Sequence, residues 1–341
     1  MKNIEDFAFI FVMPVLSVSI VILVIIFIIR CRKKPAVQSQ ETLPAKHCAP
    51  AYQLTDIDAA TDGFNHRRIM GKGRLGTVYA AVLPTGELAA VKRIHPWLVL
   101  SNAGFGFSSV IKTLSLVQHP HVVPILGFAQ APGERIIVMD FDGLVSLDLY
   151  LHESCDVASL LDWNRRLRVA AGVARGLHYL HEGVAPNIVH GCVKASNILL
   201  DVKFCAKLCD YGLSFLLPQE KGGLVGYVDD DYWVGSGVGS GGGGGGASKE
   251  SDVYGFGVVL LELLCGRRSG GGWLMKWALP LIKEMRFNEV LDPRLVIPGD
   301  IKPLVRFAKI ASACIGNNRK DRPSISQVST ILNNLEIEVC L

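Results

Sequence analysis

The sequence has few charged residues and no cysteine pairs with the spacing of a zinc site. Lysine, arginine, aspartate and glutamate make up 19% of the 341 residues, and the net charge is only +4. We therefore expect no nucleic-acid partner. Nine cysteines are scattered along the chain, and only Cys205 and Cys209 lie close together. An odd number of thiols without a framework is typical of a reducing compartment.

Charge is missing altogether from residues 7–29, in the run FAFIFVMPVLSVSIVILVIIFII. At about 1.5 Å per residue, a helix of this length crosses the ~30 Å hydrocarbon core of a bilayer. A cleaved signal peptide would have a shorter apolar region followed by a small-residue cleavage site. Basic residues crowd into 30–34, which places the following chain in the cytoplasm and residues 1–6 outside. We expect a single-pass protein of the plasma membrane.

Residues 30–64 are predicted to form a juxtamembrane linker that ends in a short helix. Prolines among polar residues favour a flexible chain at its start. Thr55 is the predicted N-cap of the helix, and Gly63 is its predicted stop. A folded domain is then expected from about residue 65.

A glycine-rich segment opens this domain with the pattern G-x-G-x-x-G. Its three glycines are Gly71, Gly73 and Gly76. The pattern alone is a weak signal, but a strand-like stretch at 77–82, a turn at 84–86 and a second strand ending in Lys92 follow it. Because no helix follows the glycines, a dinucleotide-binding fold is excluded. Such a hairpin instead lets backbone N–H groups and Lys92 approach phosphates, with Val78 and Ala90 over an adenine.

The second half of the domain begins with a helical pattern and continues with polar motifs. Residues 160–183, LLDWNRRLRVAAGVARGLHYLHEG, repeat apolar positions at helical spacing and end in a glycine. The segments that follow are IVHGCVKASNILLD at 188–201, LCDYG at 208–212, SDVYGFGVVLLELLCGRR at 251–268 and DRPS at 321–324.

With these motifs, the chain resembles the plant receptor-like kinases, and in particular their crinkly-type group. GYVDDDYW at 226–233 resembles that group's G-Y-L-D-P-E-Y-Y, and the resemblance extends from about residue 52 to 335. It implies an α+β, bilobal protein kinase-like fold behind the membrane helix. The kinase-like domain is expected at 65–337, with a β-rich N-lobe over about 65–140 and a helical C-lobe over about 141–337.

The resemblance also assigns roles to individual residues, with ATP and Mg²⁺ as cofactors. The expected nucleotide-binding residues are Gly71, Gly73, Gly76, Val78, Ala90, Lys92, Met139 and Leu199. The expected magnesium ligands are Asn197 and Asp210. Asp252 is expected to steady the backbone of the catalytic loop, and Asp231 is expected to pair with Arg322.

Four departures from the family pattern remove parts of the chemistry. Cys192 occupies the position of the catalytic aspartate, although Lys194 is retained, and a thiol is a poor proton acceptor at pH 7. Val110 occupies the position of the helix glutamate, so Lys92 is expected to lose its orienting partner. The other two departures are Leu224 for a threonine and Gly191 for the phosphate-reading arginine. Residues 215–235 contain no serine or threonine, which matches the loss of that arginine.

These losses favour a pseudokinase, with no catalytic residue expected. It would act as a scaffold or allosteric partner of active receptor-like kinases or other membrane signalling proteins, anchored in the lipid bilayer through residues 7–29. ATP and Mg²⁺ binding is expected to be weak or vestigial. The alternative is an active, atypical serine/threonine kinase that transfers the ATP γ-phosphate to protein hydroxyls, with one of Asp229, Asp230 and Asp231 replacing the base. The glycine-rich stretch 235–248 is interpreted as an exposed spacer.

Overall fold

The computed structural model of the protein describes six stretches of the chain. These are residues 48–101, 106–141, 143–153, 161–216, 225–234 and 246–340. The predicted membrane helix at 7–29, Leu224 and most of the predicted glycine spacer lie outside them. No helix within the described stretches is long and apolar enough to cross a membrane.

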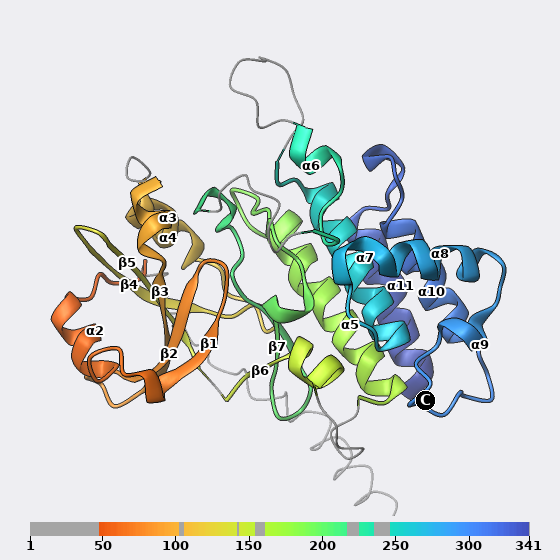
Figure 1. The fold of residues 1–341 in the computed structure, drawn as a ribbon, viewed down its shortest axis with the longest axis horizontal. Coiled ribbons are helices and arrows are strands. Elements are labelled where there is room, and N and C mark those ends of the chain that lie inside the picture. The colour runs from red at the N-terminus through yellow and green to blue at the C-terminus, as the bar shows by residue number, and fades with distance from the viewer. Residues whose placement is uncertain are drawn as a thin grey trace, which may run out of the picture. The chain divides into compact units, whose positions relative to one another are not determined.

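A five-stranded antiparallel sheet builds the N-terminal lobe, in the order β1-β2-β3-β5-β4 (Figure 1). Its strands are β1 (Ile69–Lys72), β2 (Gly76–Val82), β3 (Leu88–Ile94), β4 (Ile125–Ala131) and β5 (Glu134–Asp140). The glycine-rich segment joins β1 to β2, with Lys72 opposite Thr77. The turn predicted at 84–86 is confirmed, since Val82 lies opposite Leu88 across β2 and β3. Gly86 turns the chain between them with φ +85°, a left-handed conformation that glycine adopts without steric cost.

Three helices belong to this lobe: α2 (Leu54–Ala60), α3 (Pro96–Ser101) and α4 (Phe107–Leu114). The short helix predicted before the domain is α2, but Thr55 is not its N-cap. Gln53 holds that position, and no side chain caps the helix start. The helix ends at Ala60, and the left-handed residue that follows its C-cap is Asp62 at φ +57°, one residue before the predicted stop. Gly63, at φ +67°, completes the motif by donating its N–H to the Asp58 carbonyl over 2.8 Å.

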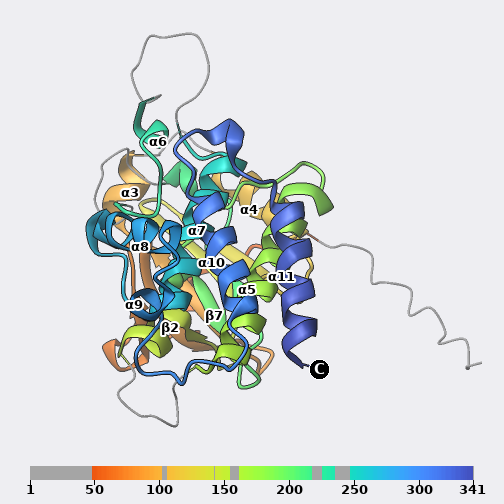
Figure 2. The ribbon, with the colours of Figure 1, turned by 90° about the vertical axis from the view of Figure 1, so that its right-hand side faces the viewer.

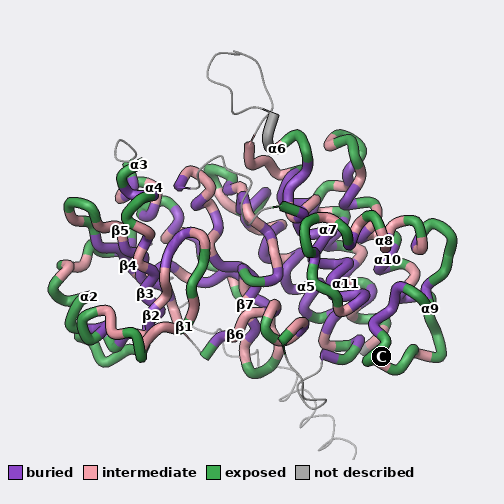
Figure 3. Tube along the Cα trace, in the orientation of Figure 1, coloured by how far each residue is buried: buried purple, intermediate pink, exposed green. Residues whose placement is uncertain are grey.

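The C-terminal lobe is helical, and two buried helices form its core (Figures 2 and 3). The apolar pattern of residues 160–183 becomes α5 (Trp163–His178) and a π-helical turn at Tyr179–Gly183. Helix α7 (Lys249–Cys265) is buried along nearly its whole length, in agreement with the mostly apolar sequence after its first turn. Helix α5 packs against α11, and α7 packs against α10. The remaining helices are α6 (Asp231–Val234), α8 (Trp273–Lys283), α9 (Phe287–Val290), α10 (Lys302–Cys314) and α11 (Ile325–Cys340).

A small three-stranded sheet brings the polar motifs of the second half together. Its strands are β6 (Val145–Ser146), β7 (Ile198–Leu200) and β8 (Ala206–Leu208). Ile198 lies opposite Leu208 in the β7–β8 pair, and the Cys209 N–H donates to the Asn197 carbonyl over 3.0 Å. Asn197 and Asp210, thirteen residues apart in sequence, therefore lie at the same end of one hairpin.

Candidate functional site

A cavity of about 750 Å³ is lined by the glycine-rich hairpin on one side and by the β7–β8 hairpin on the other. This volume lies in the range of small-molecule sites. The predicted nucleotide-binding residues that line it are Gly71, Gly73, Val78, Ala90, Lys92, Met139 and Leu199. The lining also includes Asn197 and Asp210, the predicted metal ligands, together with Cys192 and Lys194. The cavity thus brings together nearly all of the residues that were assigned to the nucleotide and the metal from the sequence.

Gly76 is a predicted nucleotide-binding residue that does not line the cavity. It starts β2, and a Cβ atom there would lie 2.0 Å from the backbone oxygen of Arg93 on the neighbouring strand. Glycine is therefore required at this position by the close approach of β2 and β3. Gly71 differs, because the space around its Cα is open.

Lys92 is buried and forms an ion pair with the Asp210 carboxylate. Burial is the largest single effect and acts to lower the pKa of Lys92. The charge and the hydrogen bond of Asp210, together with smaller effects of its surroundings, outweigh burial, so the pKa is raised above its ordinary value. The expectation that Lys92 lacks an orienting partner is therefore wrong. Val110, in the helix glutamate's position, packs on the hydrophobic core from α4 and is not among the residues lining the cavity.

Cys192 occupies the base position as a neutral thiol. Burial raises its pKa to about 11, so the thiol stays protonated at pH 7 and has no charge with which to accept a proton. The backbone around it is well formed. The Cys192 N–H donates to His190 Nδ1 over 3.4 Å, and the Cys192 carbonyl accepts from Asn197 Nδ2 over 2.9 Å.

Asp252 holds the loop that carries Cys192, as predicted. Its carboxylate accepts hydrogen bonds of 2.7 Å from the backbone N–H groups of His190 and of Gly191. The Nε2 atom of His181 lies 2.9 Å away. Gly191 has φ +83°, and a Cβ there would lie 2.7 Å from Cβ of Ser214. The loop geometry therefore favours glycine where the family pattern has arginine.

Tyr211 ties the segment after Asp210 to the N-terminal lobe, a role that the sequence did not reveal. Its ring is buried, and its hydroxyl lies 3.2 Å from the Val123 carbonyl and 3.4 Å from the Leu114 carbonyl at the end of α4. Asp210 itself has φ +63°. The hydroxyl that distinguishes Tyr211 from phenylalanine thus fixes α4 relative to the cavity.

Asp229, and not Asp231, pairs with Arg322. Its carboxylate accepts a hydrogen bond of 2.5 Å from Arg322 and two of 2.7 Å from Arg319. Asp231 is exposed and lies 3.7 Å from Arg319. The predicted pair was therefore wrong by two residues. Because both oxygens of Asp229 are bound by arginines, Asp229 is poorly placed to act as a substitute base.

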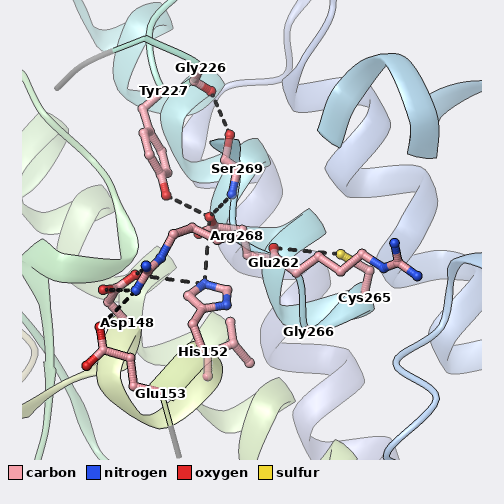
Figure 4. A network of polar contacts seen from close by, with 12 residues as sticks. Asp148, His152, Glu153, Gly226, Tyr227, Glu262, Cys265, Gly266, Arg268 and Ser269 are labelled. Carbon is pink, nitrogen blue, oxygen red and sulfur yellow. Dashed lines mark hydrogen bonds and ion pairs between the residues drawn. The ribbon is translucent and has the colours of Figure 1, made fainter. Parts of the chain in front are cut away.

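A buried network around Glu262 of α7 holds the neighbouring segment in place (Figure 4). The Tyr227 hydroxyl donates to Glu262 over 2.6 Å, and the Ser269 N–H donates to it over 2.7 Å. His152 Nε2 lies 3.8 Å from Glu262 Oε1. Burial raises the pKa of Glu262 to about 7 and lowers the pKa of His152 to about 4.

The replacement Glu262→Gln is expected to remove a pH dependence of stability. In the wild type, the stabilisation from the protonated carboxyl is complete below the unfolded pKa of 4.5 and is lost as pH rises through the folded pKa of about 7. As pH rises between these two values, the free energy of unfolding of the variant should therefore increase by about 3 kcal/mol relative to that of the wild type. Urea denaturation over this range measures it. His152 titrates in both proteins, so its contribution cancels when the stability of the wild type is subtracted from that of the variant at each pH.

The exposed Glu289→Gln variant serves as the control, since that carboxylate lies on the surface beside Arg286. Its stability curve should run parallel to that of the wild type. A Glu262→Gln curve that also ran parallel to wild type would contradict the assignment of this pH dependence to Glu262.

The family model for protein tyrosine and serine/threonine kinases matches residues 64–332. The chain belongs to this family of protein kinases. The kinase relatives include Phytosulfokine receptor 1 of Arabidopsis thaliana, 36% identical over 294 residues, which are 82% of this chain and 28% of the relative. Serine/threonine-protein kinase-like protein CCR2 of Arabidopsis thaliana is 33% identical over 287 residues, 83% of this chain and 34% of the relative. The chain thus spans about a third or less of these relatives.

The bilobal kinase fold also agrees with a solved structure, that of the pseudokinase domain of BIR2, an immune regulator of the RLK/Pelle family. The TM-score is 0.70 at 33% identity, with 84% of this chain and 86% of that chain covered. The predicted receptor-like kinase resemblance is therefore confirmed. Protein kinases use ATP and Mg²⁺.

Arg74 and Cys209 are among the lining residues that were not predicted from the sequence. Arg74 lies inside the glycine-rich segment, and Cys209 directly precedes Asp210. Both were visible as members of motifs, but neither position is one of those to which the resemblance gives a role. Arg74 adds a positive charge near Cys192.

Proposed function

We propose that this kinase-family protein is a pseudokinase, anchored in the plasma membrane through residues 7–29 with its kinase domain in the cytoplasm. It acts as a scaffold or allosteric partner of an active receptor kinase. The observation that carries the proposal is Cys192, a neutral, half-buried thiol in an otherwise intact catalytic loop. The kinase fold of the relatives, and the pseudokinase domain among the similar structures, support it.

Loss of the base affects the step that a kinase must perform on its acceptor. The substrate hydroxyl has to be oriented and has to give up its proton, an effect of about 10²–10⁴-fold for a positioned base. A thiol with a pKa of about 11 is already protonated at pH 7. Asp252 cannot replace it, because its carboxylate oxygens bind the His190 and Gly191 N–H groups.

The ion pair of Lys92 further separates this cavity from an active site. In an active kinase, the corresponding lysine pairs with the helix glutamate and thereby faces the phosphates. Here Val110 offers no carboxylate, and Lys92 binds Asp210 instead. Lys92 and Asp210 then neutralise each other's charge. This supports a kinase fold that does not transfer phosphate.

We propose that the cavity still admits a nucleotide. Val78, Ala90, Met139 and Leu199 give it apolar walls for an adenine ring, and Gly71 leaves open space beside the loop backbone. Nucleotide binding without transfer would stabilise the two lobes relative to each other. The partner would then recognise a lobe arrangement and would receive no phosphate from this protein.

The Cys192→Ala variant is expected to bind and regulate a partner kinase as well as the wild type does, because the thiol takes no part in chemistry. Each protein is co-expressed with a panel of active receptor kinases, and both association and partner autophosphorylation are measured. We expect the two proteins to bind the same partner and to change its autophosphorylation to the same extent. A partner effect that disappears with Cys192→Ala would contradict the proposal, as would a panel that neither protein binds.

A further inference from the structure

The part of the cavity around Cys192 carries an excess of positive charge. Lys92, Lys194 and Arg74 all line the cavity. Cys192 lines the same cavity, and Lys92 reaches the Asp210 carboxylate there. The three cations therefore surround one small region, and a hydrogen bond made by any of them leaves its charge in place.

The negative charge that would balance these cations has been reduced. The family pattern places three carboxylates here, at the base, at the helix position and at the metal position. Cys192 and Val110 have removed two of them, so Asp210 alone remains of the three. It forms its ion pair with Lys92. Near Cys192, three cations thus face one of these carboxylates. Lys72 and Asp140, at the ends of β1 and β5, add one further charge of each sign to the lining.

Asp148 and Glu153 of the lining belong to the segment after β5 and have partners of their own. Asp148 accepts a hydrogen bond of 2.8 Å from Arg268, and Glu153 accepts one of 3.1 Å from the same guanidinium (Figure 4). They therefore do little to offset the charge of Lys92, Lys194 and Arg74.

The residues present fit a magnesium ion poorly. Mg²⁺ demands a near-ideal octahedral set of oxygens and is usually held by one or two carboxylates together with phosphates. The single carboxylate of this region is engaged by Lys92, so a metal ion would have to displace a buried lysine. Asn197 donates its amide to the Cys192 carbonyl and offers only its neutral oxygen.

We propose that this cavity binds ATP as the metal-free anion, with Lys92, Lys194 and Arg74 neutralising the phosphates in place of Mg²⁺. The proposal rests on the proposed retention of nucleotide binding. Free ATP carries more negative charge than its magnesium complex, so a site with excess positive charge prefers the free form. Magnesium ions then compete with the protein for the phosphates and weaken binding.

Isothermal titration of the full-length protein with ATP tests this, once in EDTA and once in excess Mg²⁺. We expect the Kd in EDTA to be lower than in Mg²⁺ by roughly three- to tenfold, because one divalent charge is removed at moderate screening. Tighter binding in Mg²⁺, or no binding in EDTA, would overturn the proposal. Phosphotransfer is not involved, so this failure would leave the proposed lack of catalysis untouched.

Asp210→Asn distinguishes the two kinds of site most sharply. In a magnesium-dependent site this change removes a metal ligand and weakens ATP binding. Here it removes the single opposing carboxylate and releases Lys92, so metal-free ATP should bind roughly three- to tenfold more tightly. A gain in affinity is a result that misfolding cannot produce. If Asp210→Asn melts at the wild-type temperature but binds metal-free ATP more weakly, the proposal is wrong.

Lys194→Ala and Lys302→Ala form a matched pair, since each removes one positive charge. Lys194 lines the cavity, whereas Lys302 lies exposed at the start of α10. Lys194→Ala should weaken metal-free binding roughly tenfold, and Lys302→Ala should leave it unchanged. Equal loss in both variants would show that only net charge matters and would contradict a built anion site.

Discussion

Cys192→Asp combined with Val110→Glu is expected to raise phosphotransfer by at least about 10²-fold over the wild-type level. The aspartate restores a proton acceptor on a loop that Asp252 already holds in place. The glutamate offers Lys92 a second carboxylate, so that Lys92 no longer depends on Asp210. Transfer of radiolabelled γ-phosphate to the protein itself and to a generic serine/threonine peptide measures the gain.

Cys192→Asn with Val110→Glu is the matched control for this restoration. Asparagine has nearly the shape of aspartate but accepts no proton, so we expect this variant to stay at the wild-type level. Equal activities of the Asp and Asn variants would assign any gain to packing or to a contaminant. A double-restored protein that folds and binds ATP without transferring phosphate would show that the base is not what the site lacks.

Asp252→Ala is expected to destabilise the protein by about 3–5 kcal/mol, although the loop it supports carries no base. The carboxylate is buried and accepts two backbone hydrogen bonds of 2.7 Å, while His181 lies 2.9 Å away. Its removal leaves all three groups buried without this partner. Urea denaturation monitored by fluorescence measures the loss.

Two further variants show whether the loss is specific to this carboxylate. Asp252→Asn keeps the shape and one acceptor, so it should cost less than Asp252→Ala. Asp230→Ala removes an exposed carboxylate two residues before Tyr232 and should change stability by no more than about 0.5 kcal/mol. If Asp252→Ala cost no more than Asp230→Ala, the preserved loop frame would have no structural role.

The elements of this fold could be predicted where the signal is local. The helical spacing of apolar residues in α5 and the turn between β2 and β3 both depend on residues that are close together in sequence. The sequence therefore predicted them. Thr55 failed as a cap because α2 begins two residues earlier than a cap at Thr55 requires. The first residue of a helix depends on the path of the chain before it. The residue pattern of the helix alone does not predict that path.

The sequence predicted which residues lie at the site, but it did not predict which ion pairs they form. The β7–β8 hairpin places Asn197 and Asp210 together because their spacing determines the register. The partner of Arg322 was missed because it lies more than 90 residues away in sequence, where an offset from Asp231 to Asp229 changes nothing in the local pattern. The pairing of Lys92 with Asp210 was missed for the same reason, since it connects β3 to the other lobe.

The most direct test of a kinase frame without a base is phosphotransfer by the unmodified protein. The wild type and Lys92→Met are purified in parallel and assayed with radiolabelled ATP in Mg²⁺, so that contaminating kinases contribute equally to both. We predict that the wild type incorporates no more phosphate than Lys92→Met. Incorporation that disappears with the Lys92→Met substitution would show that Cys192 does not prevent turnover, and the pseudokinase assignment would be wrong.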